Sequence, residues 1–285
     1  MYAQVFDRRR LALPLIFPAV GGLIYLNIFD APQRLILINA GALVLALAWI
    51  ALGRLPADRR FRLGIAWACA ALLFVPLLTG PEMGGVARWF PAGPITLHSG
   101  PLLLPLIAVL CAREEKWGAA PLALAAFALA LQSDGAALLA LGLAGAALAW
   151  LHRSLTFAAL SLFALSLTAF TFQDASLTPQ QFTEGVLADA FDRTFIQGLG
   201  FAMMLFVIPL WHLVVDPQLQ RTEGYTLAAL LIGLGLAAVM APYPYPLIGY
   251  GASPILGFGL ALGAAALRDQ LRVTELFELM ERTRE

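Results

Sequence analysis

The sequence predicts an all-α integral membrane protein with ten transmembrane helices. Of its 285 residues, 60% are hydrophobic and only 13% are charged, and the mean hydropathy is +0.81. A soluble globular domain is nearer half apolar and a quarter charged. The charged residues are also confined to short gaps between long apolar runs. Both observations favour a chain that lies in a bilayer.

Ten apolar stretches form the expected helices, each compared with the roughly 20 residues that a membrane span needs. Six are clear: 11–29, 35–53, 63–80, 155–172, 195–215 and 225–241. Four are shorter or interrupted: 100–112, 118–132, 135–151 and 255–267. An alternative with nine spans merges residues 118–151 into one hairpin or kinked helix. The first stretch superficially resembles a signal peptide, but it is about a full span long and has no clear cleavage site before Asp30, which indicates an uncleaved helix.

The distribution of basic residues favours ten spans over nine. With a cytoplasmic N-terminus, ten spans place fifteen of the 18 lysines and arginines inside and leave only Arg34, Arg88 and Arg193 outside. Such an excess marks the cytoplasmic side of a membrane protein. Merging two spans would invert every later loop and remove the bias. We therefore expect both termini in the cytoplasm and three sizeable outer connections, one of which lies between helices 7 and 8: 81–99, 173–194 and 242–254.

The domain organisation follows from the same pattern. Residues 1–267 form a single ten-helix transmembrane domain, whose helices are rich in alanine, glycine and leucine, so that their backbones can approach closely. Residues 268–285 alternate apolar and charged positions and predict a short amphipathic cytoplasmic tail. That tail either lies solvated at the interface or docks a partner.

Several site classes find no support in the sequence. Cys69 and Cys111 have no nearby partner cysteine, so neither a disulfide framework nor a CxxC metal site is indicated. His98, His152 and His212 lie in separate segments without ligand spacing. Nucleic-acid binding is not expected, because no basic patch with interleaved aromatic residues occurs.

Polar residues in the outer connections are the candidates for function, because polar groups beside apolar spans are costly. Arg88, next to Trp89, is either an interfacial anchor or a forked cation for a phosphate. Asp134 is either the N-cap of the following helix or a functional carboxylate. Prolines prevent a helix through residues 242–246, and the Pro- and Gly-rich segment 242–254 is expected to be a re-entrant or cavity-lining loop.

The outer connection 173–194 carries a charged cluster just ahead of the eighth span. It contains Glu184, Asp189, Asp192 and Arg193. One interpretation is a solvated loop helix with an acidic first turn. The other is a carboxylate held over a headgroup cavity as a general base or metal ligand.

Motifs in four of these regions occur in a fixed order along the chain. Gly85-Val86-Ala87-Arg88-Trp89 leads to Leu97-His98-Ser99-Gly100, and Ser133-Asp134-Gly135 follows. Asp189 then precedes Leu199-Gly200 by eleven residues to the glycine. The last motif runs from Pro246 through Gly249-Tyr250-Gly251 to Ser253. Together, within a ten-span frame, they resemble the SEDS family of RodA/FtsW-like polytopic membrane glycosyltransferases.

The resemblance implies a membrane glycosyltransferase that polymerises a lipid-linked disaccharide of the lipid II type into peptidoglycan strands. It would serve cell elongation or division and cell shape, as a multi-pass protein of the bacterial inner membrane. A sugar hydroxyl attacks the anomeric carbon of the donor, and undecaprenyl pyrophosphate leaves. This chemistry needs a base, together with positive charge or a divalent cation (Mg²⁺ or Mn²⁺) near the pyrophosphate. The implied partners are the polyprenyl-pyrophosphate-linked sugar, membrane lipids and a class B penicillin-binding protein or similar single-span protein.

The same resemblance suggests site residues. Asp189 is the catalytic candidate, as the base or as a metal-assisting carboxylate, and the expected substrate-binding residues are Arg88, Trp89, Ser99, Asp134, Arg193, Tyr250 and Ser253. Among them, Arg88 is expected to face the leaving pyrophosphate, with Arg193 as the second choice.

The chain also departs from the family pattern. Gly100 replaces the glutamate of the second motif, Leu103 and Leu104 lie near the place of an expected lysine, and Leu187-Ala188 and Gln197-Gly198 replace other family residues. These departures leave open a non-catalytic SEDS-like scaffold or regulator. The short, broken helices and polar groups near the spans leave open a flippase or transporter for a lipid-linked sugar.

Overall fold

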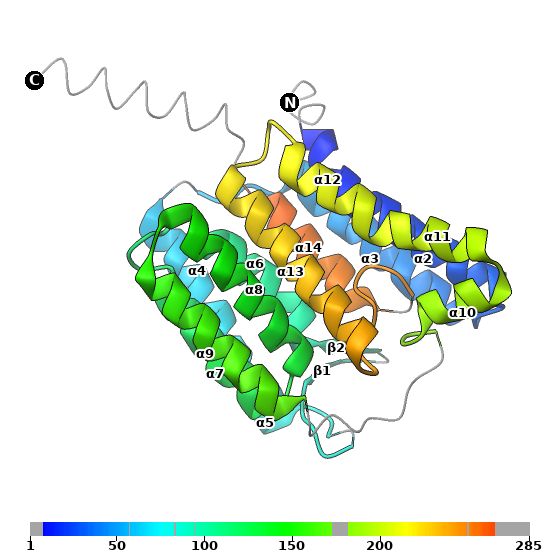
Figure 1. The fold of residues 1–285 in the computed structure, drawn as a ribbon, viewed down its shortest axis with the longest axis horizontal. Helices are drawn as coiled ribbons and strands as arrows, with labels where there is room; N and C mark the ends of the chain where they lie inside the picture. Colours follow the sequence, from blue (N-terminus) through cyan, green and yellow to red (C-terminus); the bar gives the residue numbers. More distant parts are fainter. Residues whose placement is uncertain are drawn as a thin grey trace, which may run out of the picture.

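The structure is a computed structural model that describes residues 8–56, 58–82, 84–93, 95–172, 182–249 and 251–265. It is mostly helical, and its helices pack into an elongated bundle (Figure 1). The expected tail, residues 268–285, lies outside the described residues and stays a prediction.

Helices cover all ten expected apolar stretches. Six are long and apolar enough to cross a membrane: Arg9–Ile28 (η1 Arg9–Ala12 and α2 Leu13–Ile28), α3 Gln33–Leu52, Arg59–Thr79 (α4 Arg59–Leu72 and α5 Val75–Thr79), α8 Gly135–His152, Phe195–Val215 (α11 Phe195–Ala202, η2 Met203–Val207 and α12 Ile208–Val215) and α13 Arg221–Met240. Four are shorter apolar helices: α6 Ser99–Cys111, α7 Ala119–Leu131, α9 Leu155–Thr171 and α14 Ala252–Ala264. Residues 118–151 form two helices, α7 and α8, rather than one kinked helix.

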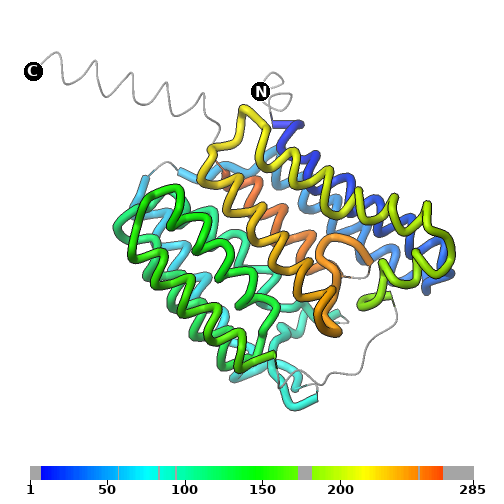
Figure 2. The backbone as a smooth tube through the Cα atoms, in the orientation of Figure 1, coloured from blue at the N-terminus to red at the C-terminus, as the bar shows by residue number. Residues whose placement is uncertain are grey.

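Three of the long segments are divided where a proline begins the second helix, the first of them at Pro14 of α2. Pro76 lies in the first turn of α5 and Pro209 in the first turn of α12, directly after the π-helical turn η2. Proline lacks a backbone N–H, so it suits the start of a helix and disturbs the ladder of the turn before it. The segment Phe195–Val215 keeps nearly the same direction across its break (Figure 2).

The expectation of an all-α protein is incomplete, because the connection after α5 contains a β-hairpin. Strands β1 (Trp89–Ala92) and β2 (Ile95–His98) pair antiparallel, with Trp89 opposite His98. Aromatic and β-branched residues favour these strands, and Gly93 takes the positive φ of +63° that the turn requires.

Close backbone approach between helices confirms the role predicted for small residues. A Cβ atom on Gly233 of α13 would lie 2.4 Å from the Cα of Ala140 in α8. One on Gly259 of α14 would lie 2.4 Å from the Cβ of Ala46 in α3. Large hydrophobic side chains instead lie exposed on the outside of α3, α9 and α12, among them Leu45, Leu162 and Trp211. An apolar exterior over a small-residue interior is typical of a helical bundle in lipid.

The two ends of the bundle differ in what they carry. The first and last described residues lie at the same end (Figure 1), where the Arg8 guanidinium donates hydrogen bonds to the carbonyls of Gly263 and Ala265 at 3.2 and 3.0 Å. The β-hairpin, α10 (Val186–Arg193) and the loop between α13 and α14 lie toward the other end. All four candidate clusters of the sequence therefore lie away from the described termini.

Candidate functional site

A cavity of about 120 Å³ lies among the β-hairpin, the loop that joins α13 to α14, and the start of α14. From the expected set it is lined by Trp89 and Ser253, and from the Pro- and Gly-rich segment by Tyr243, Pro244, Tyr245 and Pro246. This confirms that the segment lines a cavity. Its prolines explain why α13 ends at Met240, and the positive φ of Gly249 (+79°) lets the chain turn back toward α14.

His98, which the sequence analysis set aside, lies in the wall of this cavity. Its Nε2 lies 2.8 Å from Oδ2 of Asp134, and its backbone N–H donates to Oγ of Ser253 at 2.7 Å. The indole of Trp89 lies beside the imidazole, with 5.8 Å between ring centroids. Only one sequence signal could have suggested His98: it belongs to the Leu97–Gly100 motif.

Asp134 combines both roles that were considered for it. Its Oδ1 accepts the Ala137 N–H at 3.1 Å, so it is the N-cap of α8, while Oδ2 binds His98. The carboxyl is fully buried. Burial alone would raise its pKa, but the charge and hydrogen bond of His98 and the charge of Arg88 hold the pKa of Asp134 below its ordinary value.

Gly100 makes room for this carboxylate. A Cβ atom at position 100 would lie 2.6 Å from Oδ2 of Asp134 and 3.0 Å from the Cβ of Ala137. A glutamate here, as in the family pattern, does not fit beside Asp134 in its present position. The departure at Gly100 and the pairing of Asp134 with His98 are therefore parts of one arrangement.

Arg88 is buried, with 1% of its surface exposed, and does not line the cavity. Its Nε donates to the Gln132 carbonyl at 3.0 Å, its Nη2 donates to the Ser133 carbonyl, and the guanidinium lies 5.9 Å from the ring of Tyr243. Arg88 thus holds the turn that presents Asp134, a geometry that favours positioning over direct contact with a phosphate.

Ser99 stabilises the same turn through Gln132. Its hydroxyl donates to Oε1 of Gln132 at 2.9 Å, and the Gln132 amide donates to the Leu73 carbonyl at the end of α4. Both side chains are buried. Ser99 therefore lies behind the cavity wall and not on its surface.

Asp189 and Arg193 lie on α10 and do not line the cavity. Asp189 is exposed and accepts a hydrogen bond from the Tyr25 hydroxyl at 2.8 Å. Arg193 is exposed, donates to the Ile28 carbonyl at 2.9 Å and lies over the ring of Phe29. Tyr250, the remaining expected residue, lies outside the described residues.

Contacts to the loop fix the place of α10. The Tyr245 N–H donates to the Thr183 carbonyl at 3.4 Å, and Thr183 lines the cavity. A Cβ atom on Gly249 would lie 2.7 Å from the side chain of Val186 in the first turn of α10. Asp189 is one turn further along the same helix.

No group of three or more histidine, cysteine, aspartate or glutamate side chains that could hold a metal ion occurs in the part of the chain that the structure describes. Mg²⁺ commonly binds through one or two carboxylates together with substrate phosphates. The exposed carboxylate of Asp189 fits this way of binding Mg²⁺, which does not need a preformed set of protein ligands.

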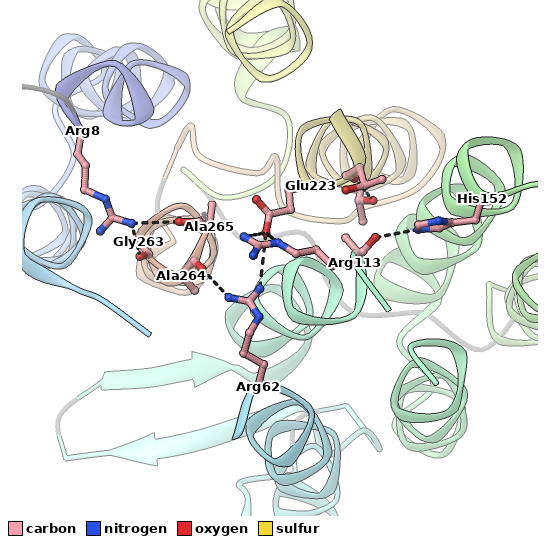
Figure 3. A network of polar contacts seen from close by, with 11 residues as sticks. Arg8, Arg62, Arg113, His152, Glu223, Gly263, Ala264 and Ala265 are labelled. Atoms are coloured by element: carbon pink, nitrogen blue, oxygen red, sulfur yellow. Dashed lines mark hydrogen bonds and ion pairs between the residues drawn. The ribbon is translucent and has the colours of Figure 1, made fainter. Parts of the chain in front are cut away.

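A second buried polar cluster lies at the end of the bundle that carries the described termini (Figure 3). Glu223, in the first turn of α13, is fully buried and binds Nε and Nη2 of Arg113 at 2.8 and 2.7 Å. Nη2 of Arg62 lies 3.6 Å from the same oxygen, and Nη1 of Arg62 donates to the Ala264 carbonyl at 3.4 Å. This cluster ties α4, α6, α13 and α14 together, far from the cavity.

The fold and the cavity define a class: a polytopic helical membrane protein with a site at one end of its bundle that aromatic and a few polar side chains line. Comparison with solved structures makes the likeness specific, because the chain has the fold of the rod shape determining protein RodA of Thermus thermophilus. That structure matches with a TM-score of 0.62 and 18% identity over 89% of this chain and 94% of that one. An aspartate-to-alanine mutant of the same protein matches with a TM-score of 0.57 and 20% identity over 89% and 95%.

A third solved structure is described as a peptidoglycan synthase complex that coordinates polymerization and crosslinking. One of its chains matches with a TM-score of 0.53 and 21% identity over 92% of this chain and 96% of that one. No protein-family model and no curated protein sequence matches this chain. At these identities, the comparisons define the fold.

Proposed function

We propose that this chain is a SEDS-type membrane glycosyltransferase that joins lipid-linked disaccharides into glycan strands, as in peptidoglycan polymerisation from lipid II. One observation carries the proposal: a RodA-like fold spans 89% of the chain, and a cavity lies where residues of its motifs meet. Trp89 and His98 belong to the two neighbouring motifs of residues 85–100, Ser253 belongs to the last motif of the chain, and all three share this cavity.

In the proposed topology all ten apolar helices cross the bacterial inner membrane and both termini are cytoplasmic. The meeting of Arg8 with Ala265 at one end of the bundle supports an even number of crossings. The cavity and α10 then face the outer side, where a lipid-linked sugar is accessible after it has been flipped.

Asp189 is the proposed catalytic carboxylate. It is exposed on α10, so it can reach a ligand without losing a buried salt bridge. It would act as the base for the acceptor hydroxyl or as the carboxylate that holds Mg²⁺ or Mn²⁺ at the donor pyrophosphate. A bound divalent cation would supply the positive charge that stabilises the leaving group. Arg193, one turn further along α10, is the exposed cation closest in sequence to that carboxylate.

A class B penicillin-binding protein or similar single-span protein is the proposed partner. The similarity to a chain of a peptidoglycan synthase complex supports it. The exposed apolar side chains of α3 and of α11 to α12 offer a surface on which a single helix could pack, in addition to lipid.

The test is polymerisation of a lipid-linked disaccharide by the purified protein, with and without its partner. Asp189→Ala should lower the rate at least about a hundredfold, the lower range for loss of a general acid or base. Asp192→Ala is the matched control, because Asp192 is an exposed carboxylate on the same helix, and it should retain activity. Wild-type protein that is inactive under both conditions would favour a non-catalytic scaffold. Full activity of Asp189→Ala would remove the catalytic assignment.

A further inference from the structure

His98 and Asp134 form a pair with the geometry of a proton-accepting site. The Nε2–Oδ2 distance is 2.8 Å, and the carboxylate is fully buried and held by the Ala137 N–H. When Nε2–H donates to the carboxylate, the tautomer of the imidazole is fixed and Nδ1 keeps its lone pair. Among the described residues, the contacts of His98 are made by its Nε2 and its backbone N–H, and none is made by Nδ1.

The imidazole is preorganised from three sides. Strand pairing places His98 opposite Trp89, its backbone N–H is held by Ser253, and its ring is held by Asp134. Asp134 is itself held in place by the preceding turn, because Arg88 donates hydrogen bonds to the carbonyls of Gln132 and Ser133. A base whose orientation is set in advance by its surroundings loses little freedom when it takes up a proton.

The cavity walls suit a sugar. Trp89, Tyr243 and Tyr245 offer apolar ring faces with polar edges, and Thr96 and Thr183 also line the cavity.

We propose that His98 accepts the proton of the attacking sugar hydroxyl, with Asp134 as its positioning residue. This inference rests on the proposed function and assigns the base at its site. The hydroxyl oxygen forms a bond to the anomeric carbon of the donor as its proton passes to Nδ1 of His98. The bond between that carbon and the pyrophosphate oxygen breaks, and its electron pair leaves on the pyrophosphate. The imidazolium, stabilised by the Asp134 carboxylate, then releases the proton to water.

Two carboxylates consequently have different tasks. Asp134 is buried behind His98 and touches no substrate, whereas Asp189 is exposed on α10. With the proton taken by His98, Asp189 is left with the second role proposed above, at the pyrophosphate end of the donor. Substitutions at His98 should therefore change the dependence of the rate on pH, and substitutions at Asp189 its dependence on divalent cation.

The experiment measures polymerisation of a lipid-linked disaccharide across pH 5 to 9 by wild type, His98→Ala and Asp134→Asn, each first shown to be folded by its thermal unfolding. His98→Ala should lower kcat at least about a hundredfold with a smaller change in KM. Added imidazole should restore part of the rate, because a small base can occupy the vacated space. Asp134→Asn should keep the contact to His98 but shift the acidic limb of the pH profile.

His212→Ala is the matched control, because His212 lies on α12 away from the cavity, and it should behave as wild type. The proposal is overturned if folded His98→Ala has the kcat of wild type. It is also overturned if the variant loses kcat but imidazole restores none of it and the pH profile is unchanged. Either outcome leaves the proposed function standing, because the wild type is active in both. An inactive wild type instead counts against the proposed function itself, and the assignment of His98 fails with it.

Discussion

Replacing Glu223 with alanine is expected to lower the free energy of unfolding by about 3–5 kcal/mol, the usual cost of removing one partner from a buried ion pair. The carboxylate is fully buried, and two arginines converge on one of its oxygens, Arg113 at 2.7 Å and Arg62 at 3.6 Å. Without it, two like charges face each other in a site with little access to water, which places the expected effect within this range and not at the small values of surface pairs.

The assay is denaturant unfolding in detergent micelles, followed by fluorescence of the six tryptophans. Glu115→Ala is the matched control, because Glu115 is an exposed glutamate close to Arg113 in sequence, and it should change the free energy by about 0.5 kcal/mol or less. A double-mutant cycle of Glu223→Ala with Arg113→Ala should give a coupling energy of at least about 1 kcal/mol, because the two groups are in direct contact.

The reasoning is refuted if Glu223→Ala is as stable as the Glu115→Ala control, or if the effects of Glu223 and Arg113 simply add. Either result would mean that the arginines are satisfied by the helix-end carbonyls alone, such as that of Ala264 for Arg62.

Three further predictions concern small and buried residues. Gly100→Glu, which restores the family residue, should lower kcat at least about tenfold rather than raise it, because its Cβ would lie 2.6 Å from Oδ2 of Asp134; an increase in the polymerisation assay would contradict this geometry. Gly233→Ala should lower the free energy of unfolding by about 1–3 kcal/mol, because its Cβ would lie 2.4 Å from the Cα of Ala140. In the control Gly41→Ala the new Cβ meets no atom within 4 Å, so this variant should be neutral or slightly stabilising in thermal unfolding. Because the folded state lowers the pKa of Asp134, the carboxylate contributes stability above the ordinary aspartate pKa of about 3.9, and this stability is lost as the pH falls through the lower folded value. The difference in Tm between wild type and Asp134→Asn should therefore narrow below about pH 4, and a wider difference would contradict the argument.

Much of the fold could be predicted because lipid imposes a simple rule on sequence. A helix in lipid must satisfy its own backbone and be apolar over its length, so the six long and four shorter apolar helices of the described residues are visible as apolar runs. The N-cap role of Asp134 and the cavity-lining role of segment 242–254 also follow from local chemistry, and both are confirmed. The β-hairpin was missed, because two four-residue strands leave only a weak pattern beside long hydrophobic runs.

The sequence by itself determined the class of protein, the helices and the segments from which the site is built, because hydropathy and turn chemistry are local properties. Only the tertiary structure decided which polar groups meet. It paired His98 with Asp134 across 36 positions, turned Arg88 inward to hold carbonyls, and left Asp189 exposed outside the cavity lining. Such contacts depend on the crossing of helices that are far apart in the chain, and no spacing within one segment records them.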